Sequence, residues 1–246
     1  MVDPISGGAL HGEIISDFEW ADADLTEAVF VDCLIDGAQF GGVVLAGARF
    51  RRCRIVRSRF ARADLREAVF EDCAFTGPAD HIGVAVAFSR LEAARFVRCD
   101  LSFATFEGSE MHALCLEDCN LRGARLRRVD FTRGLGRRRS EAAATFRRCN
   151  FHLADLAEVR LPGCDLAGSR FRDADLSGVD LEGADLRDSD LFGAILTEAK
   201  LAGADLRGAE ISGLDLLALS SRTGLKVTLD QQYALLTALG VDVHVD

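Results

Sequence analysis

The sequence predicts a solenoid with four sides per coil, built from repeats of five residues. Every fifth residue is large and apolar from Ile15 to Phe75, from Leu91 to Phe131 and from Phe146 to Leu216. These 37 centres are all Leu, Phe, Ile, Met or Trp. A small residue (Ala, Cys, Ser or Val) stands two places before 33 of them, and Gly, Asp, Glu or Arg stands two places after 32. A second period, four repeats long, sorts the centres into four classes.

A repeat of five residues fits neither a single amphipathic helix nor a single long strand. In a helix, a step of five residues drifts by about 140° and scatters the centres around the cylinder. In a strand, an odd step sends successive centres to opposite faces and exposes half of them. The chain can point every centre inward only by turning once per five residues, and glycine after the centre suits such tight turns.

The 20-residue period gives the number of sides. Residues 20 apart stack on the same side of consecutive coils, which gives four sides of five residues and a square cross-section. With 37 sides, we expect about nine coils and, at about 4.8 Å per stacked strand, a rod of about 44 Å. The classes in the first block are Phe30, Phe50, Phe70; Ile15, Ile35, Ile55; Trp20, Phe40, Phe60; and Leu25, Leu45, Leu65.

Eight cysteines follow the repeat rather than a metal-binding motif. Cys33, Cys53 and Cys73 recur with the longer period, as do Cys99 and Cys119, and seven of the eight occupy the small inward position. The sequence has no CxxC pair and no paired Cys and His spacing of the kind that zinc requires. We expect the thiols to pack in the core as small apolar side chains. The sequence therefore predicts no metal and no cofactor.

Length and composition indicate a soluble, cytoplasmic protein. Of the 246 residues, 49% are hydrophobic and 28% are charged, which is too apolar for a disordered chain. The N-terminal residues lack a basic segment followed by an apolar run, and no stretch reaches the roughly 20 apolar residues of a membrane span. The net charge of −10 argues against direct binding to nucleic acid or an anionic membrane.

Several repeats carry a family resemblance. ADLRE, CDLAG, ADLSG, VDLEG, ADLRD and ADLRG are similar to the A(D/N)LXX pattern of the pentapeptide-repeat proteins. The resemblance covers residues 13–218 and implies an all-β fold, the right-handed quadrilateral β-helix. We therefore assign residues 1–218 to the β-helix. The family's fold supports many functions, so the repeat alone does not specify one.

The first interruption of the repeat follows Phe75. The centres resume only at Leu91, and the register is then shifted by one residue. Pro78, Gly83 and the shift together predict a loop over about residues 78–88.

The second interruption follows Phe131. The centres resume in phase at Phe146, so residues 134–143 are either a loop or two poorly formed sides of a coil. A pair of glycines and three consecutive arginines are typical of exposed turns, which favours the loop.

Charge is distributed in three zones. Residues 1–48 carry nine acidic and no basic side chains, residues 49–148 carry 21 arginines against 13 acidic residues, and residues 149–246 carry 17 acidic against eight basic residues. A solvated exterior explains such charges, because every solenoid needs polar outward positions. The alternative is an extended negative rod, comparable to duplex DNA with its phosphate every 3.4 Å along each strand.

Residues 219–246 leave the repeat and are expected to cap the solenoid, whose open end would expose strand edges and core. A short helix is predicted by the apolar spacing of Leu229, Tyr233, Leu236 and Leu239. Gly240 then stops the helix, and a short strand is predicted by the alternation of Val241, Val243 and Val245. The segment also resembles the C-terminal segment of Qnr- and MfpA-type members. That resemblance implies a homodimer through the four helical residues.

The sequence contains no recognisable catalytic site. An enzyme needs convergent groups, such as a nucleophile beside a base, a metal cluster or a phosphate loop. The paired carboxylates of Asp188 and Asp190 are products of the repeat, and the five histidines are scattered. We therefore expect no enzymatic activity.

The resemblance to the Qnr type implies a DNA-mimicking protein that binds DNA gyrase or topoisomerase IV. Such a protein would protect the enzyme from quinolones or from a natural topoisomerase poison. The alternative is a structural scaffold for protein–protein interaction with no topoisomerase partner. The two projecting loops also resemble the Qnr type, which implies partner-binding residues at Asp80, His81, Arg137, Arg138 and Arg139.

Overall fold

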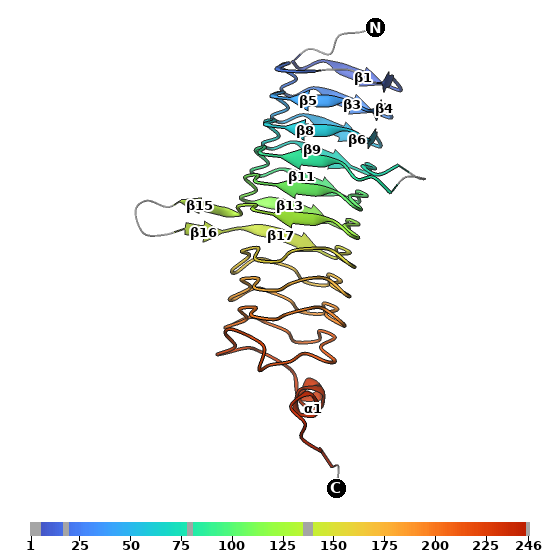
Figure 1. Ribbon diagram of the computed structural model, residues 1–246. Helices are drawn as coiled ribbons and strands as arrows, with labels where there is room; N and C mark the ends of the chain where they lie inside the picture. Colours follow the sequence, from blue (N-terminus) through green and yellow to red (C-terminus); the bar gives the residue numbers. More distant parts are fainter. Residues whose placement is uncertain (1–5, 17–19, 78–80, 135–139, 245–246) are drawn as a thin grey trace.

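The computed structural model describes residues 6–16, 20–77, 81–134 and 140–244, which form a long all-β solenoid ending in one helix (Figure 1). Each coil has four sides, called here faces 1 to 4 in the order in which the chain visits them. The strand pairs within the faces are parallel, and among the described strands only the pair β15–β16 is antiparallel. The centres and the small residues two places before them point inward on every face.

Face 1 is a seven-stranded sheet in which strands from consecutive coils are neighbours. Its register places Phe30 beside Leu10 and Phe50, as the 20-residue period predicts. Leu10 is therefore an inward centre that the sequence analysis missed. The strands in order are β1 (Ala9–His11), β3 (Val29–Val31), β6 (Arg49–Arg51), β9 (Val69–Glu71), β11 (Arg95–Val97), β13 (Leu114–Glu117) and β17 (Ala144–Arg147).

Faces 2 to 4 complete the square. Where the structure describes it, face 4 has no regular strand along its column and is held by single-residue bridges that link Asp24, Val44, Asp64, Arg90 and Glu110 in turn. Face 2 contains β2 (Ile14–Ser16), β4 (Leu34–Asp36) and β7 (Arg54–Val56). Face 3 contains β5 (Gln39–Gly41), β8 (Arg59–Ala61), β10 (Ala85–Ala87), β12 (Thr105–Glu107) and β14 (Arg125–Arg127).

Beyond β17 the coils continue without regular strands. Isolated bridges link Thr145 to Asp165 and Asp165 to Asp185 on face 1. The aspartate of the A-D-L repeat holds the turn that follows it: Oδ1 of Asp185, for example, accepts the backbone N–H of Arg187 at 3.1 Å. The seven strands of face 1 span about six turns. The regular ladder thus covers fewer turns than the nine coils expected from the sequence.

The core is a set of stacked columns of side chains. The rings of Phe30 and Phe50 are 4.5 Å apart and nearly parallel, and those of Phe50 and Phe70 are 4.7 Å apart. Phe40 and Phe60 stack in the same way on face 3. Seven of the eight free cysteines are buried in this core, which confirms that they pack as core residues.

The first interruption is shorter than predicted, because residues 85–87 form β10. Val86 lies between Phe60 and Phe106 on face 3 and is buried, so it is a centre that the sequence analysis assigned to a loop. The pairing of Phe60 with Val86 makes this coil six residues longer than the standard coil. The insertion lies between Phe75 and Val86, where the chain passes from face 2 to face 3.

The second interruption contains an antiparallel hairpin instead of coil sides. β15 (Thr132–Gly134) pairs with β16 (Ser140–Ala142), in the register Thr132 to Ala142. Leu116 and Phe146 are neighbouring centres on face 1, so this coil is ten residues longer than the standard coil. The hairpin projects from the solenoid on the side opposite to the first insertion in the view of Figure 1.

The tail forms the helix α1 (Leu229–Ala238), and Gly240 follows it with a φ of +76°. The predicted strand after the helix was wrong for residues 241–244, which are not in a strand, while Val245 lies outside the described residues. Among the described residues, no helix has the length and apolar character needed to cross a membrane.

Candidate functional site

Charge is balanced on three of the four faces. Most pentapeptides direct three residues outward, namely the one before the centre and the two after it, although a few of these, such as Val56, Ala87 and Asp180, are buried. The positions considered are those of the described residues between Leu10 and Gly213, apart from residues 133–142. They carry nine carboxylates and nine arginines on face 1, five and five on face 2, and six and five on face 3. These faces contribute almost nothing to the net negative charge.

Face 4 holds the acidic excess. The same count gives nine carboxylates against four basic residues, a net charge of −5. The basic residues are Arg66, Arg90, Arg160 and Lys200. The carboxylates, called here the acidic face, are Asp24, Glu27, Asp64, Glu67, Glu92, Glu110, Asp130, Asp180 and Glu182.

Two of these carboxylates, Asp24 and Asp64, show how face 4 spaces its charges and favours their ionised form. The bridges from Asp24 to Val44 and from Val44 to Asp64 place the two aspartates two coils apart, about 10 Å along the rod. Thr26 donates hydrogen bonds to Oδ1 of Asp24 and lowers the pKa of that carboxyl. The hydrogen bonds from Arg66 lower the pKa of Asp64. Both groups are therefore ionised at neutral pH.

The hairpin β15–β16 starts on face 4. It follows Phe131, a centre of that face, and Oδ1 of Asp130 accepts hydrogen bonds from Thr132 N and Oγ1 at 2.8 and 2.7 Å. The hairpin and the acidic face therefore share one side of the solenoid. The partner-binding residues expected at its tip, Arg137, Arg138 and Arg139, lie outside the described residues.

The first insertion lies on another side of the molecule. It joins face 2 to face 3, and the ring of its exposed residue His81 is 5.5 Å from the ring of Phe103. Asp80, the other residue expected to bind a partner here, lies outside the described residues. The structure therefore does not bring the two insertions together.

The helix α1 is fastened to the last coil by one buried side chain. Nε2 of Gln231 donates to the carbonyls of Leu206 and Ala209 at 2.6 and 2.7 Å. The apolar residues expected at the dimer interface lie away from this contact. Leu229, Tyr233 and Leu239 are 85%, 59% and 40% exposed, and Leu236 is half-buried.

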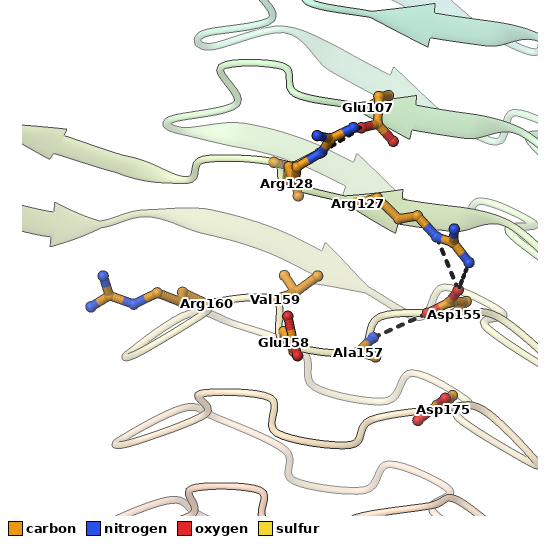
Figure 2. A pocket seen from close by; sticks show the side chains of 10 residues that line it. Glu107, Arg127, Arg128, Asp155, Ala157, Glu158, Val159, Arg160 and Asp175 are labelled. Carbon is orange, nitrogen blue, oxygen red and sulfur yellow. Dashed lines mark hydrogen bonds and ion pairs between the residues drawn. The ribbon is translucent and has the colours of Figure 1, made fainter.

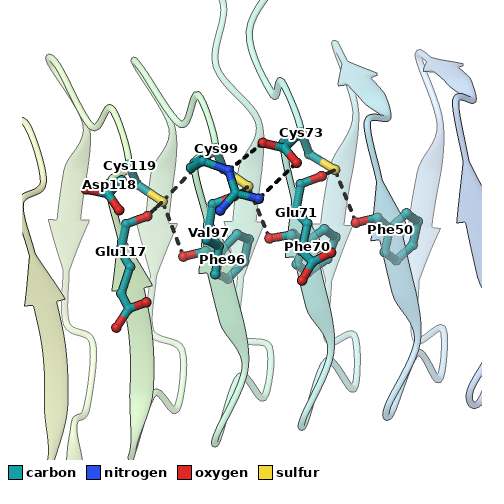
Figure 3. A network of polar contacts seen from close by, with 12 residues as sticks. Phe50, Phe70, Glu71, Cys73, Phe96, Val97, Cys99, Glu117, Asp118 and Cys119 are labelled. Atoms are coloured by element: carbon teal, nitrogen blue, oxygen red, sulfur yellow. Dashed lines mark hydrogen bonds and ion pairs between the residues drawn. The ribbon is translucent and has the colours of Figure 1, made fainter.

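A corner between faces 1 and 2 carries a ladder of ion pairs between coils. Arg52 pairs with Asp32, Arg98 with Asp72 and Arg148 with Asp118, each across neighbouring coils. Beside the ladder, the Cys73 thiol donates to the Phe50 carbonyl at 3.4 Å and the Cys99 thiol to the Phe70 carbonyl at 3.3 Å (Figure 3). Each of these contacts joins one coil to the next. Both members of each ion pair are therefore used within the solenoid itself.

A groove of about 700 Å³ lies where face 3 meets face 4. Arg127 pairs with Asp155 and Arg128 with Glu107, while Arg160 points away from both pairs (Figure 2). The groove contains neither histidine nor a hydroxyl or thiol nucleophile. Across the described residues, no group of three or more His, Cys, Asp or Glu could hold a metal ion. The groove therefore offers salt bridges but no catalytic constellation.

The acidic face could have been found from the sequence. Its residues flank the centres of one class, which begins with Leu25, Leu45 and Leu65. Sorting the outward positions by the 20-residue period separates this face from the three balanced ones, whereas counting charge along the chain mixes all four.

The sequence matches the family model described as pentapeptide repeats, in eight copies, over residues 44–77, 87–123, 149–188 and 184–216. These segments together cover more than half of the chain. No curated protein matches the sequence significantly.

Solved structures with the same fold include three of one protein. The structure of full-length QnrB1, a plasmid-mediated fluoroquinolone resistance protein, is similar with a TM-score of 0.80 and 22% identity, over 95% of this chain and 100% of that one. HetL, a pentapeptide repeat protein involved in heterocyst differentiation regulation from the cyanobacterium Nostoc sp. strain PCC 7120, is similar with a TM-score of 0.53 and 19% identity, over 90% and 87% of the two chains. At these identities the likeness establishes the fold.

Proposed function

Because the chain belongs to the pentapeptide-repeat family, we propose that it is a DNA-mimicking protein that binds DNA gyrase or topoisomerase IV. Binding would protect the enzyme from quinolones or from a natural topoisomerase poison. The likeness to a fluoroquinolone resistance protein over 95% of the chain supports this choice. The proposed role is binding and not catalysis, in the cytoplasm.

The observation that carries the proposal is the concentration of carboxylates on one side of a straight rod. Outside residues 133–142, face 4 has a net charge of −5, while the other three faces are neutral or nearly so. Such a face offers a DNA-binding channel a row of negative charges on a narrow, rigid support. Electrostatic attraction of this kind raises the association rate and falls with added salt. A rod of about nine coils would present this row over roughly 44 Å.

The hairpin is the second element of the proposed interface. It leaves the solenoid from face 4 beside Asp130, so a partner that contacts the acidic face also meets the hairpin. Insertions are free to carry specificity because they have no part in the core. We assign partner contacts to Arg137, Arg138 and Arg139 of this hairpin, whose guanidiniums suit carboxylates of the partner, and to Asp80 and His81 of the first insertion.

We also propose a homodimer through α1. Leu229 and Tyr233 are exposed on the side of the helix away from Gln231, and burial of such side chains against a second copy removes apolar surface from water. A two-fold dimer of this kind would double the length of the acidic rod. The rival function is a structural scaffold that holds other proteins, for which the same solenoid would serve.

A supercoiling assay separates the two functions. Purified protein is added to gyrase, relaxed plasmid and an inhibiting concentration of a quinolone. Protection predicts that supercoiling returns with increasing protein and that the protein alone, at high concentration, competes with DNA. No change in supercoiling with gyrase or topoisomerase IV, with any poison tested, would contradict the proposal and leave the scaffold.

A further inference from the structure

Face 3 carries two arginines in one column that form no ion pair within the described residues. The proposed role of the acidic face gives these arginines no function. Arg59 on β8 and Arg125 on β14 occupy the same outward column, with Ala85 and Thr105 between them in register. Three strand spacings separate them, about 14 Å at about 4.8 Å per spacing. Both arginines are exposed, and within the described ranges neither has an ion-pair partner.

An exposed aromatic ring lies between the levels of these two arginines. Phe88 is 59% exposed and follows β10 at the corner of face 3, below Arg62 of the preceding coil. A methyl group on Gly108 would lie 2.7 Å from the Cδ1 and Cε1 atoms of Phe88, so the ring lies over that glycine and is held by the backbone. The neighbouring side chains at this level of face 3 are small, because Ala61 and Ala87 lie beside the ring.

The charge around this surface selects the partner. Between residues 49 and 131, face 3 has five arginines against one carboxylate, while the adjoining face 4 has five carboxylates against two arginines. A duplex nucleic acid is wider than one face and would meet the acidic face within a Debye length of about 8 Å. A single extended polypeptide is narrow enough to lie along face 3 alone. Aromatic residues and arginines are also the side chains enriched in protein interfaces.

We propose that face 3 binds an acidic linear segment of a partner protein in extended conformation, with the pattern acidic-x-apolar-x-acidic. In a strand, residues two apart point to the same side, and four residues span about 13 Å at about 3.3 Å each. The segment lies between the column of Arg59 and Arg125 and the opposite corner of face 3, which carries Phe88. From there one carboxylate extends to Arg59, the other to Arg125, and the apolar side chain between them to Phe88. This surface is separate from the acidic face, and the inference does not depend on a topoisomerase partner.

Fluorescence anisotropy with a labelled peptide containing Glu-Ser-Leu-Ser-Glu tests the inference. The control peptides are Gln-Ser-Leu-Ser-Gln, which lacks the charges, and Glu-Glu-Ser-Leu-Ser, which keeps them at the wrong spacing. The double variant Arg59→Ala/Arg125→Ala should weaken binding of the first peptide about tenfold or more, the loss expected for two charge-assisted contacts. Phe88→Ala should weaken it about fivefold, as for loss of one apolar anchor.

The matched control is Arg51→Ala/Arg54→Ala, which removes two exposed arginines from faces 1 and 2 and should leave affinity unchanged. Thermal melts establish that every variant is folded. The inference is overturned if the peptide shows no saturable binding at millimolar concentration, if the control double variant weakens binding as much, or if both control peptides bind equally well. Tighter binding of a labelled oligothymidine at the same arginines would assign face 3 to nucleic acid instead.

Discussion

Arg98 and Asp72 form a two-point ion pair between consecutive coils. Nε of Arg98 donates to Oδ1 of Asp72 at 2.7 Å, and Nη2 donates to Oδ2 at 3.0 Å. Both residues stand at a corner of the coil with positive φ, near +52°, so their side chains leave the backbone in the same direction. Alternation of Asp and Arg at this corner places opposite charges on successive coils, where equal charges would repel.

This ladder predicts a loss of stability in acid. Hydrogen bonds from arginine lower the pKa of Asp32, Asp72 and Asp118, and the hydrogen bonds from Arg207 lower that of Asp205 to about 2. A carboxyl whose pKa is lower in the folded state stabilises the fold above its unfolded pKa of about 3.9 and loses this contribution as the pH falls through the folded value. The melting temperature should therefore stay level to about pH 4 and fall between pH 4 and 2.

The triple variant Asp32→Asn/Asp72→Asn/Asp118→Asn tests the origin of that loss. It should show a shallower fall of melting temperature in acid, because three of the titrating pairs are absent. Asp188→Asn is the control, since Asp188 stands in the same corner column and has no ion pair within the described residues. Identical acid profiles for the triple variant and the wild type would remove the ladder as the cause.

The stacked centres should dominate stability. Phe50 is 1% exposed between the rings of Phe30 and Phe70, so Phe50→Ala leaves a cavity and should cost about 3 to 5 kcal/mol of unfolding free energy. Arg51→Ala, at the next and outward position, should change it by less than about 0.5 kcal/mol. Urea denaturation measures both. Equal losses would contradict the assignment of centres to the core.

The proposed dimer depends on the exposed side of α1. Leu229→Asp/Tyr233→Asp should give a monomer at micromolar concentration, because two charges would have to be buried against the second copy. The control is Ala238→Asp, an exposed position on the side of the helix that carries Gln231, and truncation after Ala218 should give a monomer or an aggregate. Sedimentation velocity measures the state of each protein. A wild-type chain that sediments as a monomer at micromolar concentration rules the dimer out.

Deletion of residues 134–143 should preserve the fold and abolish rescue of gyrase from a quinolone. The ten residues are the excess of this coil over the standard coil, so their removal restores the repeat length. Deletion of residues 78–83 restores the other long coil in the same way and serves as the comparison. If the first deletion keeps both the melting temperature and full rescue, the hairpin has no part in protection.

The sequence was sufficient for the fold because one period determines both local turns and long-range stacking. Apolar centres, four faces and core cysteines all follow from the five-residue repeat and its fourfold multiple. Val86 was missed because it is smaller than the other centres and follows an insertion of six residues that broke the count. The predicted strand at Val241 and Val243 failed for another reason: alternation needs a neighbouring strand to pair with, and the described chain offers none there.

The candidate site was harder to predict from the sequence than the fold. Charge counted along the chain gave three zones, whereas charge counted around the coil gives one acidic face and three balanced ones. Whether an arginine is engaged also depends on neighbours in the adjacent coil, as for Arg148 and Asp118 across the coil that contains the hairpin. These ion-pair partners cannot be predicted from the sequence until the length of each coil is known.

Affinity for gyrase after neutralisation of the acidic face tests the central claim most directly. The variant Glu27→Gln/Glu67→Gln/Glu110→Gln removes three charges from face 4, and Glu71→Gln/Glu117→Gln/Asp188→Asn removes three from face 1. Binding is measured by surface plasmon resonance at two salt concentrations, with duplex DNA as competitor. The account predicts that DNA displaces the wild type, that the face 4 variant binds about tenfold or more weakly with a smaller salt dependence, and that the face 1 variant binds as the wild type does. Equal affinities for the two variants, or binding that DNA leaves unchanged, would contradict it.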